Sequence, residues 1–165
     1  MKTEQAFDQY HQAVYSFAYR LTRRADIAED IAQECFLSLI RAPHRFDPQR
    51  GSLKTFLFAM ARNLVLKNYR DNREDAAGDD LPGGSADPRS ALEIGAAVER
   101  AVASLPHLQQ EALVLFEYEG VTLEEISQIV GTDVGTVKSR LHRARERLRR
   151  ELAAYRPVRG MHGTV

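Results

Sequence analysis

The stretch TLEEISQIVGTDVGTVKSRLHRARERLRREL, residues 122–152, decides how the C-terminal part of the chain folds. Its beginning predicts a short helix, because Thr122 and Glu125 form a capping-box pattern and apolar residues follow at helical spacing. Gly131 ends this helix, since glycine adopts the left-handed backbone of a helix end without steric cost. A second helical pattern begins almost at once. The stretch therefore predicts two helices joined by a tight turn of four residues.

The longer helix of this pair has an apolar side and a basic, polar side. Thr132 is placed to cap it, with Asp133 in the first turn, where the helix dipole favours a carboxylate. The inward stripe consists of Val134, Val137, Leu141, Ala144, Leu148 and Leu152. The opposite side holds Gly135, Ser139, His142, Arg143 and Glu146, flanked by Lys138, Arg140, Arg145 and Arg147. A solvated helix face carries similar charges, but a capped short helix, a tight turn and a basic long helix together are typical of a DNA-binding helix-turn-helix.

The N-terminal part of the chain shows the same helical spacing. We expect one helix from about residue 4 to 22, a second starting near Asp26, and a third from about residue 53 to 70. Asp26 and Glu29 form another capping-box pattern, and the two prolines and the glycine between Pro43 and Ser52 predict a loop. The apolar residues that mark these helices are Phe7, Tyr10, Val14, Phe17 and Leu21, then Ile27, Ile31, Phe36, Leu39 and Ile40, then Leu53, Leu57, Met60 and Leu64.

A segment rich in Gly, Pro, Asp and Ser, NREDAAGDDLPGGSADPRS (72–90), separates the two helical parts and predicts a flexible linker. After it we expect a helix near 91–104, and then a helix with Pro106 in its first turn that stops at Gly120. Strand-like alternation and internal repeats are missing from the sequence. The expected fold is all-α, with domains over 1–71 and 91–153, the linker 72–90 between them and a short tail over 154–165.

The net charge of the chain is zero, but the charges are unevenly distributed. Residues 1–70 carry 11 basic and 7 acidic side chains, and residues 138–165 carry 9 and 2. Between these blocks, residues 71–98 carry 2 basic and 7 acidic side chains, and residues 99–137 carry 1 and 7. The basic ends suggest contact with nucleic acid. The acidic middle either limits unproductive contact with DNA or is simply solvated.

The composition argues against several other classes of protein. No apolar run approaches the length of a membrane span and the N-terminus lacks a signal peptide, so we expect a cytoplasmic protein. Cys35 is the only cysteine, which excludes an intramolecular disulfide and a multi-cysteine zinc site, and we expect it in the core. The five histidines are scattered singly. Without a nucleophile motif, metal-ligand spacing or phosphate-binding glycine loop, we expect no catalytic residues, no metal and no cofactor.

Two separate motifs resemble regions of bacterial sigma factors. VGTVKSRLHRARERLRREL (134–152), preceded by SLPHLQQEALVLFEYEGVTLEEISQIVGT, strongly resembles region four, which reads the minus-35 promoter element. DIAEDIAQECFLSLIRA (26–42) resembles region 2.2, which docks on the polymerase clamp, and RFDPQRGSLKTFLFAMARNLVLKNYR (45–70) resembles the loop and helix that melt and read the minus-10 element. The resemblance covers nearly all of 7–152 and leaves no room for the extra regions of housekeeping sigma factors. The chain is identified as a member of the extracytoplasmic-function (ECF) group.

The resemblance implies three sets of site residues. The polymerase-facing set is Asp30, Gln33 and Glu34, with Ile31 supporting their helix. The minus-10 set is Phe46, Asp47, Phe56, Asn63 and Lys67, where Phe56 stands in a place at which relatives commonly carry tryptophan. The minus-35 set is Thr136, Lys138, Ser139, Arg140, His142, Arg143 and Arg145. From the residues alone, the acidic side chains of the polymerase-facing set are typical of a solvated helix face. Phe46 is typical of a core position, and Asn63 and His142 are typical of ordinary surface positions.

The implied function is to bind core RNA polymerase, at its clamp and flap, and to direct initiation at promoter DNA, for a stress or envelope-response regulon. Members of this group are usually held inactive by an anti-sigma factor, so such a partner is implied too. One alternative is a helix-turn-helix regulator that acts without core polymerase, although the first 70 residues show no βα alternation typical of a receiver domain. The other alternative is an enzyme with a helical fold.

Overall fold

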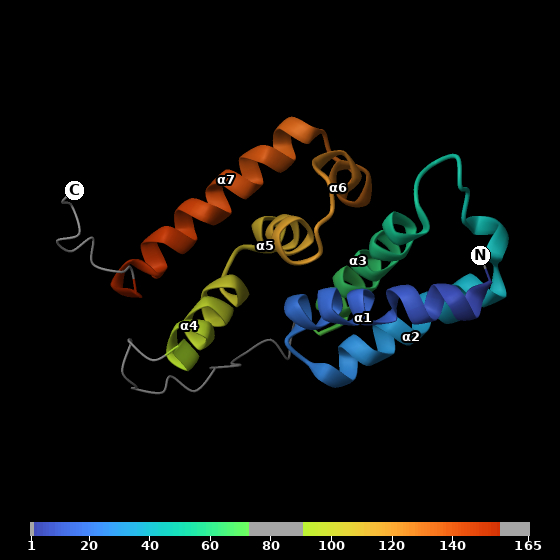
Figure 1. Ribbon diagram of the computed structural model, residues 1–165, viewed down its shortest axis with the longest axis horizontal. Helices are drawn as coiled ribbons and strands as arrows, with labels where there is room; N and C mark the ends of the chain where they lie inside the picture. Colours follow the sequence, from blue (N-terminus) through green and yellow to red (C-terminus); the bar gives the residue numbers. More distant parts are fainter. Residues whose placement is uncertain (1, 73–90, 156–165) are drawn as a thin grey trace, which may run out of the picture.

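The computed structural model of the protein describes residues 2–72 and 91–155 (Figure 1). Within these ranges all regular secondary structure is helical, which confirms the expected all-α fold. The predicted linker lies between the two ranges and, apart from Asn72, outside the described residues, as does most of the predicted tail. Among the described helices, none has the length and apolar character needed to cross a bilayer.

The N-terminal group consists of α1 (Thr3–Thr22), α2 (Ala25–Arg41) and α3 (Leu53–Asp71). The three helices pack on one another around an aromatic centre, where the rings of Phe17 and Phe58 meet edge to face with centroids 5.4 Å apart. Such pairs add to the free energy gained by burying the rings. The helix bounds agree closely with the predicted ones. A short 3-10 turn, Pro43–Arg45, begins the loop between α2 and α3.

The apolar positions of these helices are buried to different degrees. The fully buried residues of α3 include Phe58, Ala61 and Val65, whereas Met60 and Leu64 are only half-buried, because α3 packs against α1 and α2 on one side and against the C-terminal half of the chain on another. Ile40 on α2 is 57% exposed, and Phe7 on α1 is 41% exposed.

The capping box expected at the start of α2 is not formed. The helix begins at Ala25 with Arg24 as its N-cap, and it has no side-chain cap. Asp26 instead accepts a hydrogen bond from the Arg24 guanidinium, at 2.9 Å. Its carboxylate therefore pairs with a side chain two residues earlier and does not cap the helix.

The C-terminal group begins with α4 (Ala91–Ala103) and α5 (His107–Leu113). A π-helical turn, η2 (Val114–Tyr118), continues α5 and was not predicted. Pro106 is the N-cap of α5 rather than a residue of its first turn. Gly120 follows the π turn with φ +65°, in agreement with the expected stop.

The remaining helices are α6 (Leu123–Val130) and α7 (Val134–Glu151), followed by the 3-10 turn Ala153–Tyr155. Thr122 caps α6 by accepting a hydrogen bond from the Glu125 amide, and Gly131 ends α6 with φ +71°, as predicted. The cap of α7 differs from the prediction, because Asp133 rather than Thr132 accepts the hydrogen bond from the Thr136 amide, at 2.6 Å. The helix-turn-helix is confirmed as a local structure.

The two groups of helices lie against each other. α3 packs beside α6, and α1 touches α5 (Figure 1). The buried apolar residues of both groups form one continuous cluster.

Candidate nucleic-acid interface

The outer face of α7 presents polar side chains in two successive turns. Lys138, Ser139, His142 and Arg143 are exposed, while Thr136 and Arg140 are half-buried. On the opposite side of the helix, Val137, Leu141 and Ala144 are buried. These three residues are the most buried part of the apolar stripe, and their packing sets the orientation of the polar face. The Ser139 hydroxyl donates to the Gly135 carbonyl at 3.2 Å, within its own helix. Lys138, His142 and Arg143 make no hydrogen bond or ion pair with another described residue, so their polar groups are available to a ligand.

Arg145 differs from the other residues of the predicted minus-35 set. Its Nη2 lies 2.7 Å from Glu117 Oε1, and its guanidinium stands over the Phe116 ring, 5.4 Å from the centroid. Both partners belong to the π turn η2, so Arg145 joins α7 to the helix beneath it. This contact is a structural role that the sequence pattern did not indicate.

An open cavity lies at the start of α3, beside the loop that precedes it. The rings of Phe46 and Phe56 meet there edge to face, with centroids 5.5 Å apart. The cavity is lined by Arg45, Phe46, Asp47, Arg50, Gly51, Ser52, Thr55, Phe56, Ala59 and Gln128. Three of the five predicted minus-10 residues therefore come together at one place.

The other two predicted minus-10 residues, Asn63 and Lys67, are exposed further along α3 and do not line the cavity. Gln128, by contrast, belongs to α6 of the C-terminal group, and sequence reasoning missed it. Its side-chain oxygen would lie 3.5 Å from a Cβ placed on Gly51. No local pattern could have found this contact, because the two residues are far apart along the chain.

The predicted polymerase-facing residues lie on α2. Asp30 and Gln33 are exposed, and Ile31 is buried beneath them. Glu34 is half-buried and accepts a hydrogen bond from the Ser38 hydroxyl at 3.3 Å. On α2, the polar side chains of Asp30 and Gln33 therefore lie on the surface, and the apolar side chain of Ile31 packs inside and anchors the helix.

Cys35 follows these residues directly and is completely buried. Burial raises the pKa of its thiol to about 12, with a further contribution from the negative charge of Glu34. A protonated, inaccessible thiol is unreactive. The expected core role of Cys35 is confirmed. Within residues 2–72 and 91–155, no cluster of His, Cys, Asp and Glu side chains is arranged to hold a metal ion.

Comparison with known proteins identifies both halves of the chain. The family model "Sigma-70 region 2" matches residues 6–74, and "Sigma-70, region 4" matches residues 95–148. The chain is 34% identical to the ECF RNA polymerase sigma factor SigE of Mycolicibacterium smegmatis over 156 residues, covering 89% of this chain and 60% of that protein. It is 30% identical to the ECF sigma factor SigW of Bacillus subtilis, covering 88% of this chain and 86% of SigW.

Among solved structures, the chain resembles the sigma factor RpoE of Bartonella quintana, which was determined in complex with the anti-sigma factor NepR. The TM-score is 0.72 at 29% sequence identity, covering 93% of this chain and 98% of RpoE. The likeness therefore extends over both groups of helices.

Proposed function

This chain belongs to the ECF group of RNA polymerase sigma factors, which direct promoter-specific transcription initiation, and from this premise we propose how its residues divide the work. The N-terminal domain, residues 1–71, binds core polymerase and the minus-10 element. The C-terminal domain, residues 91–153, binds the minus-35 element. The protein acts as a regulatory subunit rather than an enzyme, and it works in the cytoplasm, where RNA polymerase and the chromosome are found.

The exposed face of α7 binds the minus-35 element. The observation that carries this assignment is that Lys138, His142 and Arg143 project from a capped helix without a partner among the described residues. In a helix-turn-helix, side chains near the start of the second helix reach base edges in the major groove. Ser139 and Arg143 then contact bases, while Lys138 and Arg140 bind phosphates. Arg145 assists them indirectly, by fixing α7 on the π turn.

The cavity at Phe46 and Phe56 takes an unpaired base of the minus-10 element. Two aromatic rings at an open cavity suit this role, because stacking on an aromatic ring replaces the stacking that a base loses when it leaves the duplex. Asp47 lines the same cavity and offers an acceptor to a base edge. Asn63 and Lys67 lie further along the same helix, where the single strand would continue.

The outward side of α2 binds core polymerase. Asp30 and Gln33 are exposed there, and the apolar side chains of Leu37 and Ile40 follow on the same helix with exposures of 42% and 57%. Exposed apolar groups beside polar ones are typical of a protein interface. The clamp of the polymerase would take this surface, and the flap would take the C-terminal domain.

An anti-sigma factor is the remaining partner. The RpoE structure contains one, and the likeness to RpoE covers both groups of helices. A protein that binds both groups at once would block the surfaces just described.

Promoter-dependent transcription with purified core polymerase tests the proposal. Core polymerase should produce transcripts from the promoter of this protein only when the wild-type chain is added. The competing candidate is a helix-turn-helix regulator that acts alone, and tight, sequence-specific binding of the free protein to a complete promoter would favour that candidate.

A further inference from the structure

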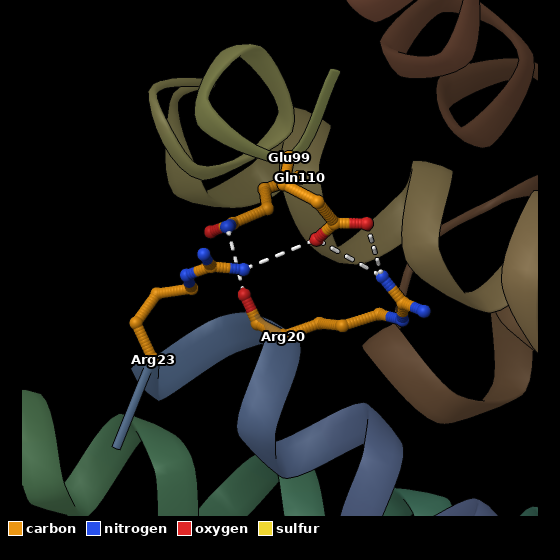
Figure 2. A network of polar contacts seen from close by, with 4 residues as sticks. All are labelled: Arg20, Arg23, Glu99 and Gln110. Atoms are coloured by element: carbon orange, nitrogen blue, oxygen red, sulfur yellow. Dashed lines mark hydrogen bonds and ion pairs between the residues drawn. The ribbon is translucent and has the colours of Figure 1, made fainter. Parts of the chain in front are cut away.

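Two basic side chains of α1 are engaged with the C-terminal group. Glu99 on α4 accepts hydrogen bonds from Arg20 Nη1 at 3.0 Å and from Arg23 Nη1 at 3.1 Å. Figure 2 shows both guanidinium groups directed at this one carboxylate. Gln110 donates a hydrogen bond from its Nε2 to the Arg20 carbonyl at 3.2 Å, and the Arg20 guanidinium lies over the Tyr118 ring, 3.8 Å from its centroid. The charges at this end of α1 are therefore used within the protein.

A second set of partnered charges lies deeper, between α3 and α5. Arg62 Nε lies 2.7 Å from Glu111 Oε2, and Arg62 Nη2 lies 3.0 Å from Glu111 Oε1. The Glu111 side chain is completely buried and that of Arg62 is 15% exposed. His107 Nε2 lies 3.2 Å from the same carboxylate. The buried carboxylate thus has close partners on two sides, as buried charges usually do.

His11 on α1 is a largely buried polar side chain without such a partner. Its Nε2 is shielded from solvent and has no hydrogen-bond partner among the residues that the structure describes. The ring lies between two phenylalanines, with its centroid 4.4 Å from that of Phe7 and 6.1 Å from that of Phe36. Glu29 Oε1 of α2 lies 3.6 Å from Nε2, just beyond hydrogen-bond distance. An unpaired buried nitrogen is uncommon because it costs free energy, so this one points to a role beyond packing.

Glu29 Oε1 is shared between His11 and a residue assigned to the polymerase-facing surface. Gln33, one turn after Glu29 on α2, donates a hydrogen bond from its Nε2 to this same oxygen at 3.4 Å. A protonated imidazole carries a donor on each nitrogen and a positive charge, and charge-assisted hydrogen bonds have lengths of about 2.7–2.9 Å. Closing the gap from 3.6 Å would therefore draw the Glu29 carboxylate toward α1 and away from Gln33.

Glu29 is the acidic group through which a charge on His11 would act. On α1, Asp8 is exposed three residues before His11 and makes no ion pair with a described residue. α3 also packs on α1, but its Lys54 and Arg62 are bound to the C-terminal group, Lys54 through a carbonyl at 3.1 Å. The charged groups of the neighbouring helices other than Glu29 are therefore exposed or already partnered.

A change at Glu29 would reach a binding partner through charge. Glu29, Asp30 and Glu34 give the outward side of α2 three exposed or half-exposed carboxylates, and the surface that binds them is expected to be basic. A protonated His11 would neutralise one of the three and would leave the Gln33 amide without its acceptor. Both changes reduce the complementarity to a basic surface.

We propose that His11 is a positioning residue for the polymerase-facing surface, and that its protonation draws Glu29 away from Gln33 and weakens binding to core polymerase. This inference rests on the proposed function, because it takes the outward side of α2 to be the surface that binds core polymerase. Histidine is the side chain whose charge ordinarily changes between about pH 5 and pH 8, so binding should weaken as the pH falls through this range.

Competition for core polymerase at pH 8 and at pH 6 tests the proposal, with the wild-type, His11→Gln and Glu29→Gln chains as competitors. Glutamine keeps a polar group near the position of Nε2 but takes up no proton. The polymerase titrates in the same way in every measurement, so its contribution cancels in the ratio of two affinities. Between pH 8 and pH 6, wild type should lose about two- to fivefold in affinity relative to His11→Gln, the range of a partly exposed charge pair. Glu29→Gln should behave as His11→Gln does.

The matched control is His44→Gln, because His44 is exposed on the 3-10 turn Pro43–Arg45 and belongs to none of the assigned sites. It should keep the pH dependence of wild type. A second measurement uses the free protein. In NMR spectra of the ¹⁵N-labelled wild-type chain, the side-chain amide signals of Gln33 should shift together with the ring signals of His11 between pH 8 and pH 6. In His11→Gln the Gln33 signals should stay in place.

Each result decides the inference. The same pH dependence in wild type and His11→Gln would overturn it, and so would a dependence that persists in Glu29→Gln or disappears in His44→Gln. Gln33 signals that do not follow those of His11 would overturn the coupling between the two residues, with no polymerase involved. If wild type failed to bind core polymerase at pH 8, the proposed function would be refuted instead, and the NMR titration would still decide whether His11 controls Glu29 and Gln33.

Discussion

The buried pair between Arg62 and Glu111 allows a quantitative test of how the two groups are held together. We consider Arg62→Met, which removes the charge and keeps most of the apolar stem, Glu111→Gln, which keeps the shape, and the double variant. Removing one partner of a buried ion pair typically costs about 3–5 kcal/mol, because a charge is left buried without a partner. Here His107 remains next to Glu111, and separation of the groups would expose the carboxylate to water. These two effects limit the expected cost of Arg62→Met to about 2–3 kcal/mol.

Glu111→Gln should cost less, about 1–2 kcal/mol, because the Arg62 side chain is 15% exposed and its charge can remain in contact with water. The double variant should then lose less than the sum of the two, with a coupling free energy of about 1–2 kcal/mol. Urea unfolding at pH 7 and 25 °C, followed by far-UV circular dichroism, measures all four free energies of unfolding.

A matched exposed pair provides the control. Arg41 and Glu34 lie 3.5 Å apart on α2, with side-chain exposures of 64% and 45%. Their coupling should be about 0.5 kcal/mol or less, as is usual for pairs in water. If the Arg62–Glu111 cycle gives a coupling no larger than this control, the reasoning that the buried pair helps to hold the two groups together is wrong.

The same pair predicts a dependence of stability on pH. Burial alone would raise the pKa of Glu111, but hydrogen bonds from His107 and Arg62 outweigh it and hold the pKa below its ordinary value of 4.5. A carboxyl group with a lowered pKa in the folded state contributes stability above its unfolded pKa and loses it as the pH falls through the folded one. The free energy of unfolding should therefore fall more steeply below pH 4.5 in wild type than in Glu111→Gln. Parallel curves for the two proteins would contradict this assignment.

Three further predictions concern the assigned surfaces. Arg143→Ala should reduce transcription from a duplex promoter by about 5- to 150-fold, the equivalent of one good base contact of about 1–3 kcal/mol. A premelted bubble template should restore transcription by Asn63→Ala at least in part, but not transcription by Arg143→Ala. Equal rescue of both variants would mean that the two domains are assigned wrongly. Reversing the charges of Asp30 and Glu34 should weaken binding to core polymerase in a competition assay without changing the helical content. If the double variant competes for core polymerase as well as wild type does, these residues do not form the docking surface. The Cys35 thiol, with its pKa raised to about 12 by burial, should react with a thiol reagent at pH 8 only after unfolding in urea, and rapid reaction of the native protein would be inconsistent with the packed α2 described here.

The sequence predicts most of the local structure because that structure depends on near neighbours. Helical periodicity located α1, α3 and α7 to within about one residue, and Gly131 marked the end of α6. The two errors at helix starts differ: α2 begins one residue before Asp26 and has no side-chain cap, whereas α7 is capped by Asp133 instead of its neighbour Thr132. Spacing alone does not show which of two adjacent residues adopts the N-cap conformation.

Local sequence patterns could not predict the contacts between the two groups of helices. Arg62 and Glu111 are 49 residues apart, and Arg20 and Glu99 are 79 apart, so no periodicity connects them. One signal was present, because a basic block over residues 1–70 stands before an acidic block over residues 99–137. Taken alone, that asymmetry suggests contact with nucleic acid at the basic ends, and an acidic middle that either limits unproductive contact with DNA or is simply solvated. The ion pairs Arg20–Glu99 and Arg62–Glu111 join these two blocks.

The π-helical turn η2 shifts the rotational phase of the helix that it continues. A regular α-helix rotates by about 100° per residue, and a π turn accommodates one residue more than a regular helix holds in the same rise. Gln110 before the turn and Tyr118 within it can therefore both contact Arg20, although they lie eight positions apart and would diverge on a regular α-helix. Deleting a single residue within Val114–Tyr118 would let the helix run on as a regular α-helix and swing Tyr118 and the start of α6 around the axis. The contact of the C-terminal group with Arg20 thus depends on helical phase, so a change of one residue in length here should matter more than most changes of side chain.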